Sequence, residues 1–259
     1  MLVGVIHLPA LPGSPRSSLP APECARSAAE CARALADARY DAIIVENFGD
    51  VPFFAGRVPA VTVAAMTACA LAVREAAPSV DLGINVLRND AESALGIALC
   101  TGAKFVRVNV LTGARVTDQG VIQGDAAALL RSRRALGAEG IAIWADVDVK
   151  HSAPLGPPRP IAQEVEDTTK RAMAEAVLVT GEGTGKGVDL DKLDAVKRAA
   201  GKTPVLVASG ATIDTLPLLA KHANGVIVGR ALRAGGVPGG ASDASLAKTF
   251  AEAYREAFG

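Results

Sequence analysis

The chain has 259 residues, and its 27 Lys and Arg balance its 27 Asp and Glu, so the formal net charge is zero. Such a balance offers no basic surface to attract nucleic acid, which excludes the electrostatically driven nucleic-acid binders. Half of the residues are apolar but only 3% are aromatic. We therefore expect a core of Val, Ile, Leu and Ala, the composition of helices packed on a parallel sheet.

Apolar runs rich in β-branched residues alternate along the chain with helical segments rich in Ala, Leu, Arg and Glu. We expect strands at Val3–Leu8, Ala42–Asn47, Asp81–Leu87, Phe105–Val110, Ile141–Val149, Ala176–Gly181, Pro204–Ser209 and Gly225–Gly229. Eight such units in about 250 residues predict an α/β fold, one (β/α)8 TIM barrel forming a single domain over residues 1–259. An open doubly wound sheet is the alternative, but the first βα turn lacks the GxGxxG pattern of dinucleotide-binding sheets.

The predicted connections differ in length at the two ends of the strands. Those from helix to strand are short, whereas those from strand to helix are long and rich in Gly, Pro and charge, as in residues 9–22, 48–60, 111–124, 151–162 and 182–189. Loops longer than a connection requires often bind ligands or cover a site. We therefore expect function at one rim, where the active sites of barrels lie.

The last two predicted strands each end in a small residue or a glycine that precedes a helical segment. Ser209 and Gly210 follow one strand, and Gly229 and Arg230 follow the other. In a barrel, the loops after strands seven and eight often bind phosphate through backbone N–H groups. We expect an anion site here; the alternative is that each glycine only allows the strand to turn.

The loop TGEGTGKGVD, residues 180–189, could form a third wall of that site. Its candidate ligand-binding residues are Gly181, Gly183, Thr184 and Gly185, because glycines leave N–H groups free to surround an anion, and Lys186 adds charge. A flexible lid is an equal alternative. Asp189 is expected to cap the following helix.

The run IAIWADVDVK supplies candidate catalytic residues. Strand alternation places Ala142, Trp144, Asp146, Asp148 and Lys150 on one face, toward the barrel axis. Carboxylates and an ammonium close together in a dry site acquire different pKa values and can serve as acid and base. We expect Asp148 and Lys150 near the rim and Asp146 deeper; the alternative is a buried ion-pair network.

Other strands add polar residues to the same interior. Glu46 and Asn85 lie in the second and third strands, and Asn109 lies in the fourth. Arg107 must be paired because it cannot lose its charge, so we expect it to bind Asp146 or Glu46. Glu46 is therefore either a ligand contact or part of the ion-pair layer.

The three histidines differ in position. His7 ends the first strand on the functional rim and is either catalytic or a packing residue. His151 could orient a loop or ligand, and His222 lies at the opposite rim. No metal or other cofactor is predicted, because no spacing such as HExxH occurs. Glu46, Asp146 and Asp148 could nevertheless hold Mg²⁺ beside a phosphate.

Cysteine spacing and hydropathy bear on location. The four cysteines show no CxxC spacing, so neither zinc nor a redox motif is indicated, and we expect a cytoplasmic protein. The apolar stretch MLVGVIHL contains His7 and is followed by Pro9, so it is interpreted as a strand. No apolar stretch of the sequence is long enough to span a bilayer. Any membrane contact would be peripheral, and we expect self-association into a homo-oligomer.

Several long motifs resemble one family. GVIHLPALPGSPR, DAIIVENFGDVPFF, LGINVLRNDA, FVRVNVLTGARVTDQGVIQG, ADVDVKHSAPL and VLVASGAT are similar to the BtpA family, which is named for a photosystem I biogenesis protein. The resemblance extends over nearly the whole chain and implies a TIM barrel akin to the ribulose-phosphate-binding barrels. Arg230 departs from the pattern, since a small hydroxyl residue is expected there; arginine can still bind phosphate bidentately.

Three functions agree with these features. The first is an isomerase, epimerase or aldolase acting on a sugar phosphate or similar compound, with Asp148 or Asp146 as base, Lys150 as acid, electrophile or Schiff-base amine, and His7 and Glu46 on ligand hydroxyls. The second is a non-catalytic assembly or stability factor for a membrane complex. Phe53 and Phe54 would be its docking patch if exposed, and a lid or a subunit contact if covered. The third is a sensor of a phosphorylated metabolite.

Overall fold

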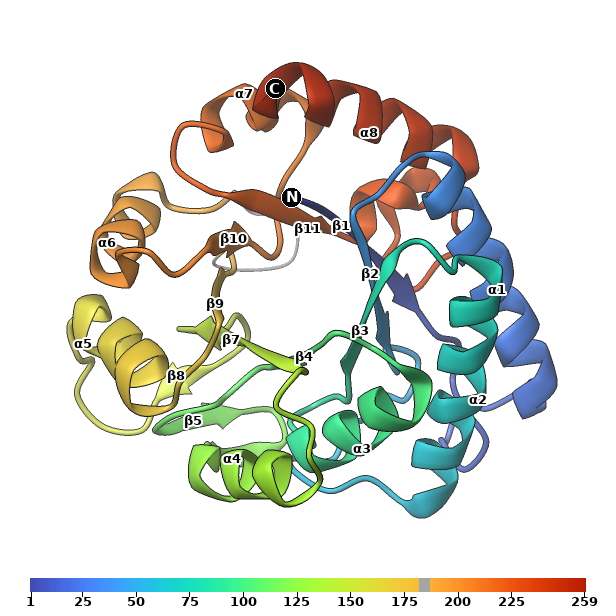
Figure 1. Ribbon diagram of the computed structural model, residues 1–259, viewed down its shortest axis with the longest axis horizontal. Helices are drawn as coiled ribbons and strands as arrows, with labels where there is room; N and C mark the ends of the chain where they lie inside the picture. Colours follow the sequence, from blue (N-terminus) through green and yellow to red (C-terminus); the bar gives the residue numbers. More distant parts are fainter. Residues whose placement is uncertain (182–186) are drawn as a thin grey trace.

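Eight parallel strands close into a barrel in the computed structural model, which describes residues 1–181 and 187–259 (Figure 1). The strands are β1 (Leu2–His7), β2 (Ala42–Glu46), β3 (Asp81–Asn85), β4 (Phe105–Val108), β7 (Ala142–Val147), β9 (Ala176–Val179), β10 (Val205–Val207) and β11 (Gly225–Val228). The last strand pairs with the first, Leu2 opposite Val226, so the open-sheet alternative is wrong. Each strand overlaps one of the predicted apolar runs.

Helices surround the barrel, as the ring of coils in Figure 1 shows. They are α1 (Ala21–Asp37), α2 (Ala60–Ala76), α3 (Ala91–Thr101), α4 (Ala126–Ala135), α5 (Ile161–Glu166), α6 (Leu190–Ala200), α7 (Leu216–Leu219) and α8 (Ala244–Phe258), with a π-helical turn at Asp167–Arg171 and 3₁₀ turns at Ile213–Thr215, Arg230–Leu232 and Ala234–Gly236. Asp189 accepts from the N–H groups of Asp191 and Lys192, which confirms its predicted role as N-cap of α6. Within the described ranges, no helix has the length and hydropathy needed to cross a bilayer.

A small antiparallel sheet lies outside the barrel and was not expected from the sequence. It consists of β5 (Ala114–Thr117), β6 (Gly120–Gln123) and β8 (Ala153–Pro154) in the order β6-β5-β8. Figure 1 shows β5 and β8 between α4 and α5. Two of the long loops therefore pair with each other, and a turn at residues 118–119 is held between β5 and β6.

Apolar side chains form one layer of the barrel interior. The rings of Phe105 and Trp144 stack with centroids 3.7 Å apart. Gly83 is required beside them, because a Cβ atom there would lie 2.2 Å from the Phe105 ring. Trp144 therefore faces inward as alternation predicts, while Ala145 and Val147 pack in the outer core between strands and helices. The interior above this apolar layer is left for polar residues.

Candidate active site

A cavity of about 640 Å³ opens at the carboxyl-terminal ends of the strands. Side chains from the strand ends and from the long strand-to-helix connections line it: Val5, His7, Glu46, Phe48, Phe53, Asn85, Leu87, Arg88, Arg107, Asn109, Asp118, Gln119, Lys150, His151, Ala208, Ser209, Gly210, Ala211, Thr212, Ile227, Val228, Gly229, Arg230, Ala231, Gly236 and Pro238. The cavity therefore lies at the rim that the unequal connections indicate.

Arg107 organises the floor of the cavity. Its Nε and Nη2 each donate to a different oxygen of Asp146, both at 3.0 Å, and its Nη1 donates to Glu46 Oε1 at 3.2 Å. All three residues are buried. Burial lowers the pKa of Arg107, but the two carboxylates outweigh burial and raise it. The predicted pairing of Arg107 is confirmed, and it includes both carboxylates.

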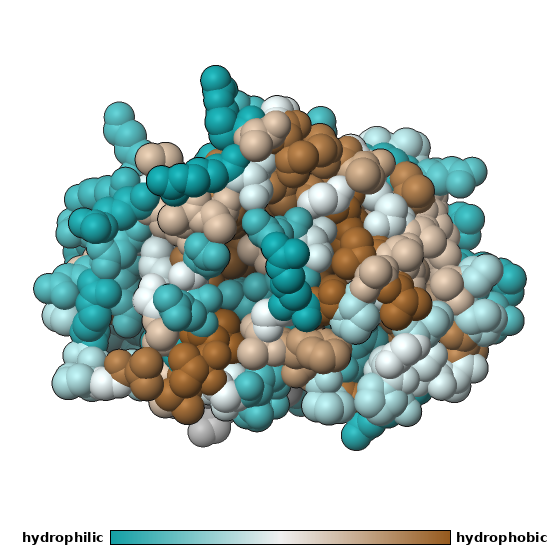
Figure 2. Space-filling model, turned by 90° about the horizontal axis from the view of Figure 1, so that it is seen from below, coloured by the Kyte–Doolittle hydropathy of each residue, from teal (hydrophilic) through white to brown (hydrophobic). Residues whose placement is uncertain are grey.

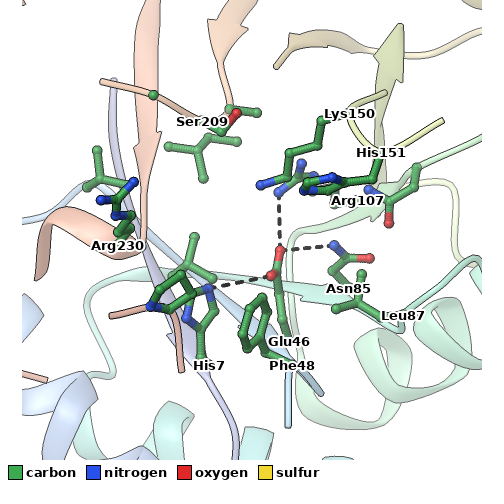
Figure 3. A pocket seen from close by; sticks show the side chains of 18 of the residues that line it. His7, Glu46, Phe48, Asn85, Leu87, Arg107, Lys150, His151, Ser209 and Arg230 are labelled. Atoms are coloured by element: carbon green, nitrogen blue, oxygen red, sulfur yellow. Dashed lines mark hydrogen bonds and ion pairs between the residues drawn. The ribbon is translucent and has the colours of Figure 1, made fainter. Parts of the chain in front are cut away.

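Glu46 presents an ionised carboxylate at this floor. Asn85 Nδ2 donates to its Oε1 at 2.9 Å, and His7 Nε2 lies 3.9 Å from its Oε2 (Figure 3). Burial alone would raise the pKa of Glu46, but Arg107, His7 and Asn85 together lower it below its usual value. Glu46 therefore belongs to the ion-pair layer and also lines the cavity.

His7 is held neutral beside Glu46. Its ring stacks on Phe48 with centroids 4.1 Å apart, and Gly239 N–H donates to Nδ1 at 3.3 Å. Burial lowers the pKa of His7 to about 4, although Glu46 opposes the shift. With Nδ1 accepting a hydrogen bond, the neutral ring carries its proton on Nε2, facing the Glu46 carboxylate.

Lys150 extends into the cavity on the side opposite Arg230, as Figure 3 shows. Burial lowers its pKa, and the neighbouring Arg107 lowers it further. His151 follows at a positive φ of 58° and also lines the cavity. Asn109 donates to Asp146 at 3.0 Å, and its Oδ1 is buried with no partner among the described residues.

The loops after β10 and β11 meet at the other side of the cavity. Gly210 has a φ of 85°, and the N–H groups of Gly210, Ala211, Arg230 and Ala231 donate to no acceptor within the described parts of the chain. Ser209 Oγ accepts from Gly181 N–H at 3.1 Å, which joins the β9 loop to this site. The candidates Gly183, Thr184 and Gly185, with Lys186, lie outside the described residues.

Two glycines in this region are explained by close packing or backbone conformation. A Cβ atom on Gly229 would lie 3.0 Å from the ring of His7. Arg230 is exposed, and its Nε donates to the carbonyl of Gly236 at 2.7 Å. Gly236 itself has a φ of 65°, which favours glycine. Arg230 is thus held at the rim beside the bare N–H groups.

Asp148 does not lie where strand alternation placed it. β7 ends at Val147, and Asp148 has a φ of 47°, so its side chain leaves the inward face. It binds Arg115 of β5 and Lys192 of α6 instead. Burial would raise the pKa of Asp148, but Lys192 and Arg115 lower it. The expectation that Asp146, Asp148 and Lys150 share one cavity wall is wrong, because Asp148 leaves the inward face and Asp146, held by Arg107 in the interior, is also absent from the cavity lining.

The proposed magnesium ligands do not converge. Glu46 and Asp146 share Arg107, whereas Asp148 is bound by Arg115 and Lys192. Over residues 1–181 and 187–259, no group of three His, Cys, Asp or Glu side chains is arranged to hold a metal ion. At the opposite rim, His222 pairs with Asp194 at 2.6 Å, away from the cavity.

Arg88 was not predicted from the sequence, and Phe53 and Phe54 were expected to act together. Arg88, three residues after β3, is 7% exposed, lines the cavity and donates from Nη2 to the carbonyl of Lys150 at 2.7 Å. The sequence feature that could have identified Arg88 is its place between a strand and the helix N-cap Asp90, at the rim where function was expected. Phe53 lines the cavity, whereas Phe54 is 55% exposed, so the pair serves neither as one patch nor as one lid.

The sequence model of the BtpA family matches residues 1–256. The chain belongs to the BtpA family. It is 45% identical over 255 residues to the photosystem I biogenesis protein BtpA of Synechocystis, covering 98% of this chain and 88% of that protein. It is also 33% identical over 243 residues to an uncharacterized mitochondrial protein of Caenorhabditis elegans, covering 91% and 86% of the two chains. The resemblance seen in the sequence motifs is confirmed.

Solved structures with the same fold are distant in sequence. N-(5′-phosphoribosyl)anthranilate isomerase from Pyrococcus furiosus superposes with a TM-score of 0.60 at 16% identity, covering 99% of both chains. The (S)-3-O-geranylgeranylglyceryl phosphate synthase of Thermoplasma acidophilum, solved with its substrate sn-glycerol-1-phosphate, gives 0.60 at 15% identity, covering 98% of this chain and 93% of that one. These likenesses establish that this BtpA-family chain is a TIM barrel.

Proposed function

We propose that this BtpA-family barrel binds a small phosphorylated metabolite and catalyses an acid–base reaction on it, of the isomerase, epimerase or aldolase type. One observation carries the proposal. At one side of the cavity, backbone N–H groups of the β10 and β11 loops have no acceptor among the described residues, and the Glu46 carboxylate and Lys150 ammonium lie at the other side. The phosphate anchors the ligand at the first side, so its carbon chain extends toward the second.

Glu46 is the base in this proposal, in place of Asp146 and Asp148. Both Asp146 oxygens accept hydrogen bonds from Arg107, and Asp148 is outside the cavity lining. Glu46 is ionised and removes a proton from the carbon next to a carbonyl. Lys150 stabilises the negative charge that develops on the carbonyl oxygen, and return of the proton gives the isomer or epimer.

His7 has a supporting role. Its neutral Nε2–H faces Glu46 at 3.9 Å and can donate to a ligand hydroxyl placed between them. The Synechocystis relative is named for photosystem I biogenesis, which describes a requirement for a complex and not a reaction. The isomerase and the synthase that share the fold are both named for phosphate-bearing compounds, and this supports a phosphorylated ligand.

Proton abstraction can be tested without knowing the product. The protein is incubated in D₂O with a panel of sugar phosphates and phosphorylated hydroxy acids, and deuterium on carbon is followed by NMR. We expect incorporation into at least one compound, and its loss by about 100-fold or more in Glu46→Gln. Asp81→Asn, a matched carboxylate-to-amide change at an exposed residue of β3 outside the cavity lining, is expected to retain it. Incorporation unaffected by Glu46→Gln would contradict the assignment of the base.

A second candidate function is a non-catalytic assembly factor for a membrane complex. The small sheet favours it, because Val116 and Val121 are paired across its strands and are 41% and 53% exposed, and Leu155 nearby is 61% exposed. Figure 2, which views the side holding α3, α4 and β5, shows apolar side chains in separate groups among hydrophilic ones.

Replacing Val116 and Val121 with Thr should abolish complex accumulation without affecting deuterium exchange if this surface docks a partner.

A further inference from the structure

Two cations at the edge of the cavity, Arg88 and Lys150, form no ion pair with any residue that the structure describes. Arg88 is 7% exposed, its Nη2 donates to the Lys150 carbonyl, and its Nε and Nη1 donate to no described residue. Lys150 is half-buried, and over the described ranges its ammonium forms no ion pair. Burial is the main cause that lowers the pKa of Arg88 and the pKa of Lys150. Arg88 also lowers the pKa of Lys150, and both cations lower the pKa of His151.

Two other buried arginines have carboxylate partners. Arg107 binds Asp146 and Glu46, and Arg115 binds Asp148 and Glu164. Arg233, like Arg88, is buried, forms no ion pair with a described residue and donates to a backbone carbonyl, that of Val5, but it lies outside the cavity lining. Burial of a charge without a partner costs several kcal/mol, so an uncompensated pair at a cavity wall is explained by a ligand that brings the counter-charge.

The geometry points to a second anion site, formed by Arg88 and Lys150, that takes a carboxylate of the ligand on the side of the cavity opposite the phosphate. This inference rests on the proposed function, because the phosphate at the β10 and β11 loops fixes the other end of the ligand. Figure 3 shows Lys150 facing Arg230 across the cavity, so the two anionic groups would be held apart. The substrate class is a phosphorylated sugar acid.

A carboxylate suits this site better than a second phosphate. The carboxylates of Asp146, Glu46 and Asp118 all influence Arg88, and a dianion would be repelled by them more strongly than a carboxylate. One of the five N–H donors of the Arg88 guanidinium is used on the Lys150 carbonyl, so enough donors are left for a bidentate pair with a carboxylate. Asn109 Oδ1, buried without a partner among the described residues, can accept from a hydroxyl next to that carboxylate.

The site also refines the reaction. With the carboxylate on Arg88 and Lys150, the adjacent carbon faces Glu46, which takes its proton. The electron pair of the broken C–H bond then moves into the carboxylate, and its added negative charge is stabilised by the two cations. Return of the proton from Glu46 to the same face regenerates the substrate with that hydrogen exchanged with solvent, whereas protonation of the opposite face gives the epimer.

Two probes that differ in one group test the inference. Titration calorimetry compares 6-phosphogluconate with glucitol 6-phosphate, which has a CH₂OH group in place of the carboxylate, and inorganic phosphate serves as the reference ligand. We expect the acid to bind about tenfold or more tightly than the alcohol, as for one or two hydrogen bonds to a charged group. Lys150→Met and Arg88→Met should each abolish the preference, and Lys221→Met, an exposed lysine at the opposite rim, should retain it.

The outcomes separate this inference from the proposed function. Equal affinity of the wild-type protein for acid and alcohol, both displaced by inorganic phosphate, would overturn the second anion site and leave phosphate binding intact. Failure of both esters and of inorganic phosphate to bind would instead remove the proposed function. A preference that survives in Lys150→Met also overturns the assignment. Because the Lys150 ammonium bonds no described residue, this variant is expected to fold and decides the case even if Arg88→Met does not.

Discussion

Arg107 Nη1 lies 3.2 Å from Glu46 Oε1, and both residues are buried above the stacked rings of Phe105 and Trp144. This contact joins β4 to β2 across the barrel interior. It also keeps Glu46 ionised, since Arg107 is the strongest influence that lowers the pKa of this carboxylate against the effect of burial. The same ion pair thus supports the fold and prepares the candidate base.

Arg107→Met is predicted to be strongly destabilising. The change leaves the Glu46 and Asp146 carboxylates buried without their cation, and breaking such a pair from one side costs about 3–5 kcal/mol. Urea denaturation measures the free energy of unfolding. Arg57→Met, which removes an exposed pair with Glu92, is the control and should cost about 1 kcal/mol or less.

The loss in Arg107→Met should also depend on pH. Without the guanidinium, burial raises the pKa of Glu46, so lowering the pH protonates this carboxylate and removes its uncompensated charge. The gap in unfolding free energy between wild type and variant should therefore narrow as the pH falls. A gap that widens toward acid pH would contradict the ion-pair account.

His7 predicts a second pH dependence. Its pKa in the folded protein is about 4, below the ordinary value of 6.5, so the unfolded chain binds more protons between these two values. Stability is therefore full above pH 6.5 and falls as the pH drops toward 4, by about 3 kcal/mol at most. Glu46, whose folded pKa is also lowered, adds its own loss at the acid end.

His7→Gln isolates that contribution. The amide does not titrate, so unfolding free energies measured between pH 7 and pH 4 should decline less in the variant than in the wild type. Arg233, Lys150 and Arg107 all disfavour the protonated ring and remain in place. Parallel curves for the two proteins would show that His7 is not buried as a neutral ring.

Much of the fold could be predicted because it depends on local patterns. Apolar β-branched runs mark each barrel strand, and the unequal connections mark the functional rim. Arg107 was placed correctly because a charge that cannot be lost must be paired wherever it is buried. Alternation likewise placed Trp144 and Asp146, which lie within β7.

Other features depend on contacts between distant segments. Alternation fails at Asp148 because the strand has already ended, and its partners Arg115 and Lys192 lie 33 and 44 residues away. The small sheet joins β5 to β8 across the whole of α4 and β7, which no short pattern reveals. Arg88 was missed because its position in the cavity depends on the path of a loop and on the carbonyl of Lys150.

Gly229→Ala should impair phosphate binding. The added methyl group would lie 3.0 Å from the His7 ring, so the ring or the β11 loop must move. Overpacking of this kind costs about 1–3 kcal/mol of stability.

Calorimetry with inorganic phosphate measures the effect on phosphate binding, and thermal unfolding measures the effect on stability. Gly96→Ala is the matched control, since nothing lies within 4 Å of its Cβ position in α3, and it should be neutral or slightly stabilising. Equal phosphate affinity in both variants would argue against a site beside Gly229.

Asp148→Ala is predicted to loosen the small sheet and not the barrel. Asp148 bonds Arg115 of β5 and Lys192 of α6, so it connects the hairpin that carries Asp118 and Gln119 over the cavity to the body of the protein. Hydrogen exchange followed by mass spectrometry should show the amides of residues 114–123 exchanging about tenfold faster, because charge-assisted hydrogen bonds that hold the hairpin are lost. The amides of β1 and β11 should be unchanged.

Asp81→Ala, at an exposed residue of β3, should leave the hairpin as it is. Unchanged exchange over residues 114–123 in Asp148→Ala would mean that other contacts hold this hairpin, and Asp148 would then be free for another role.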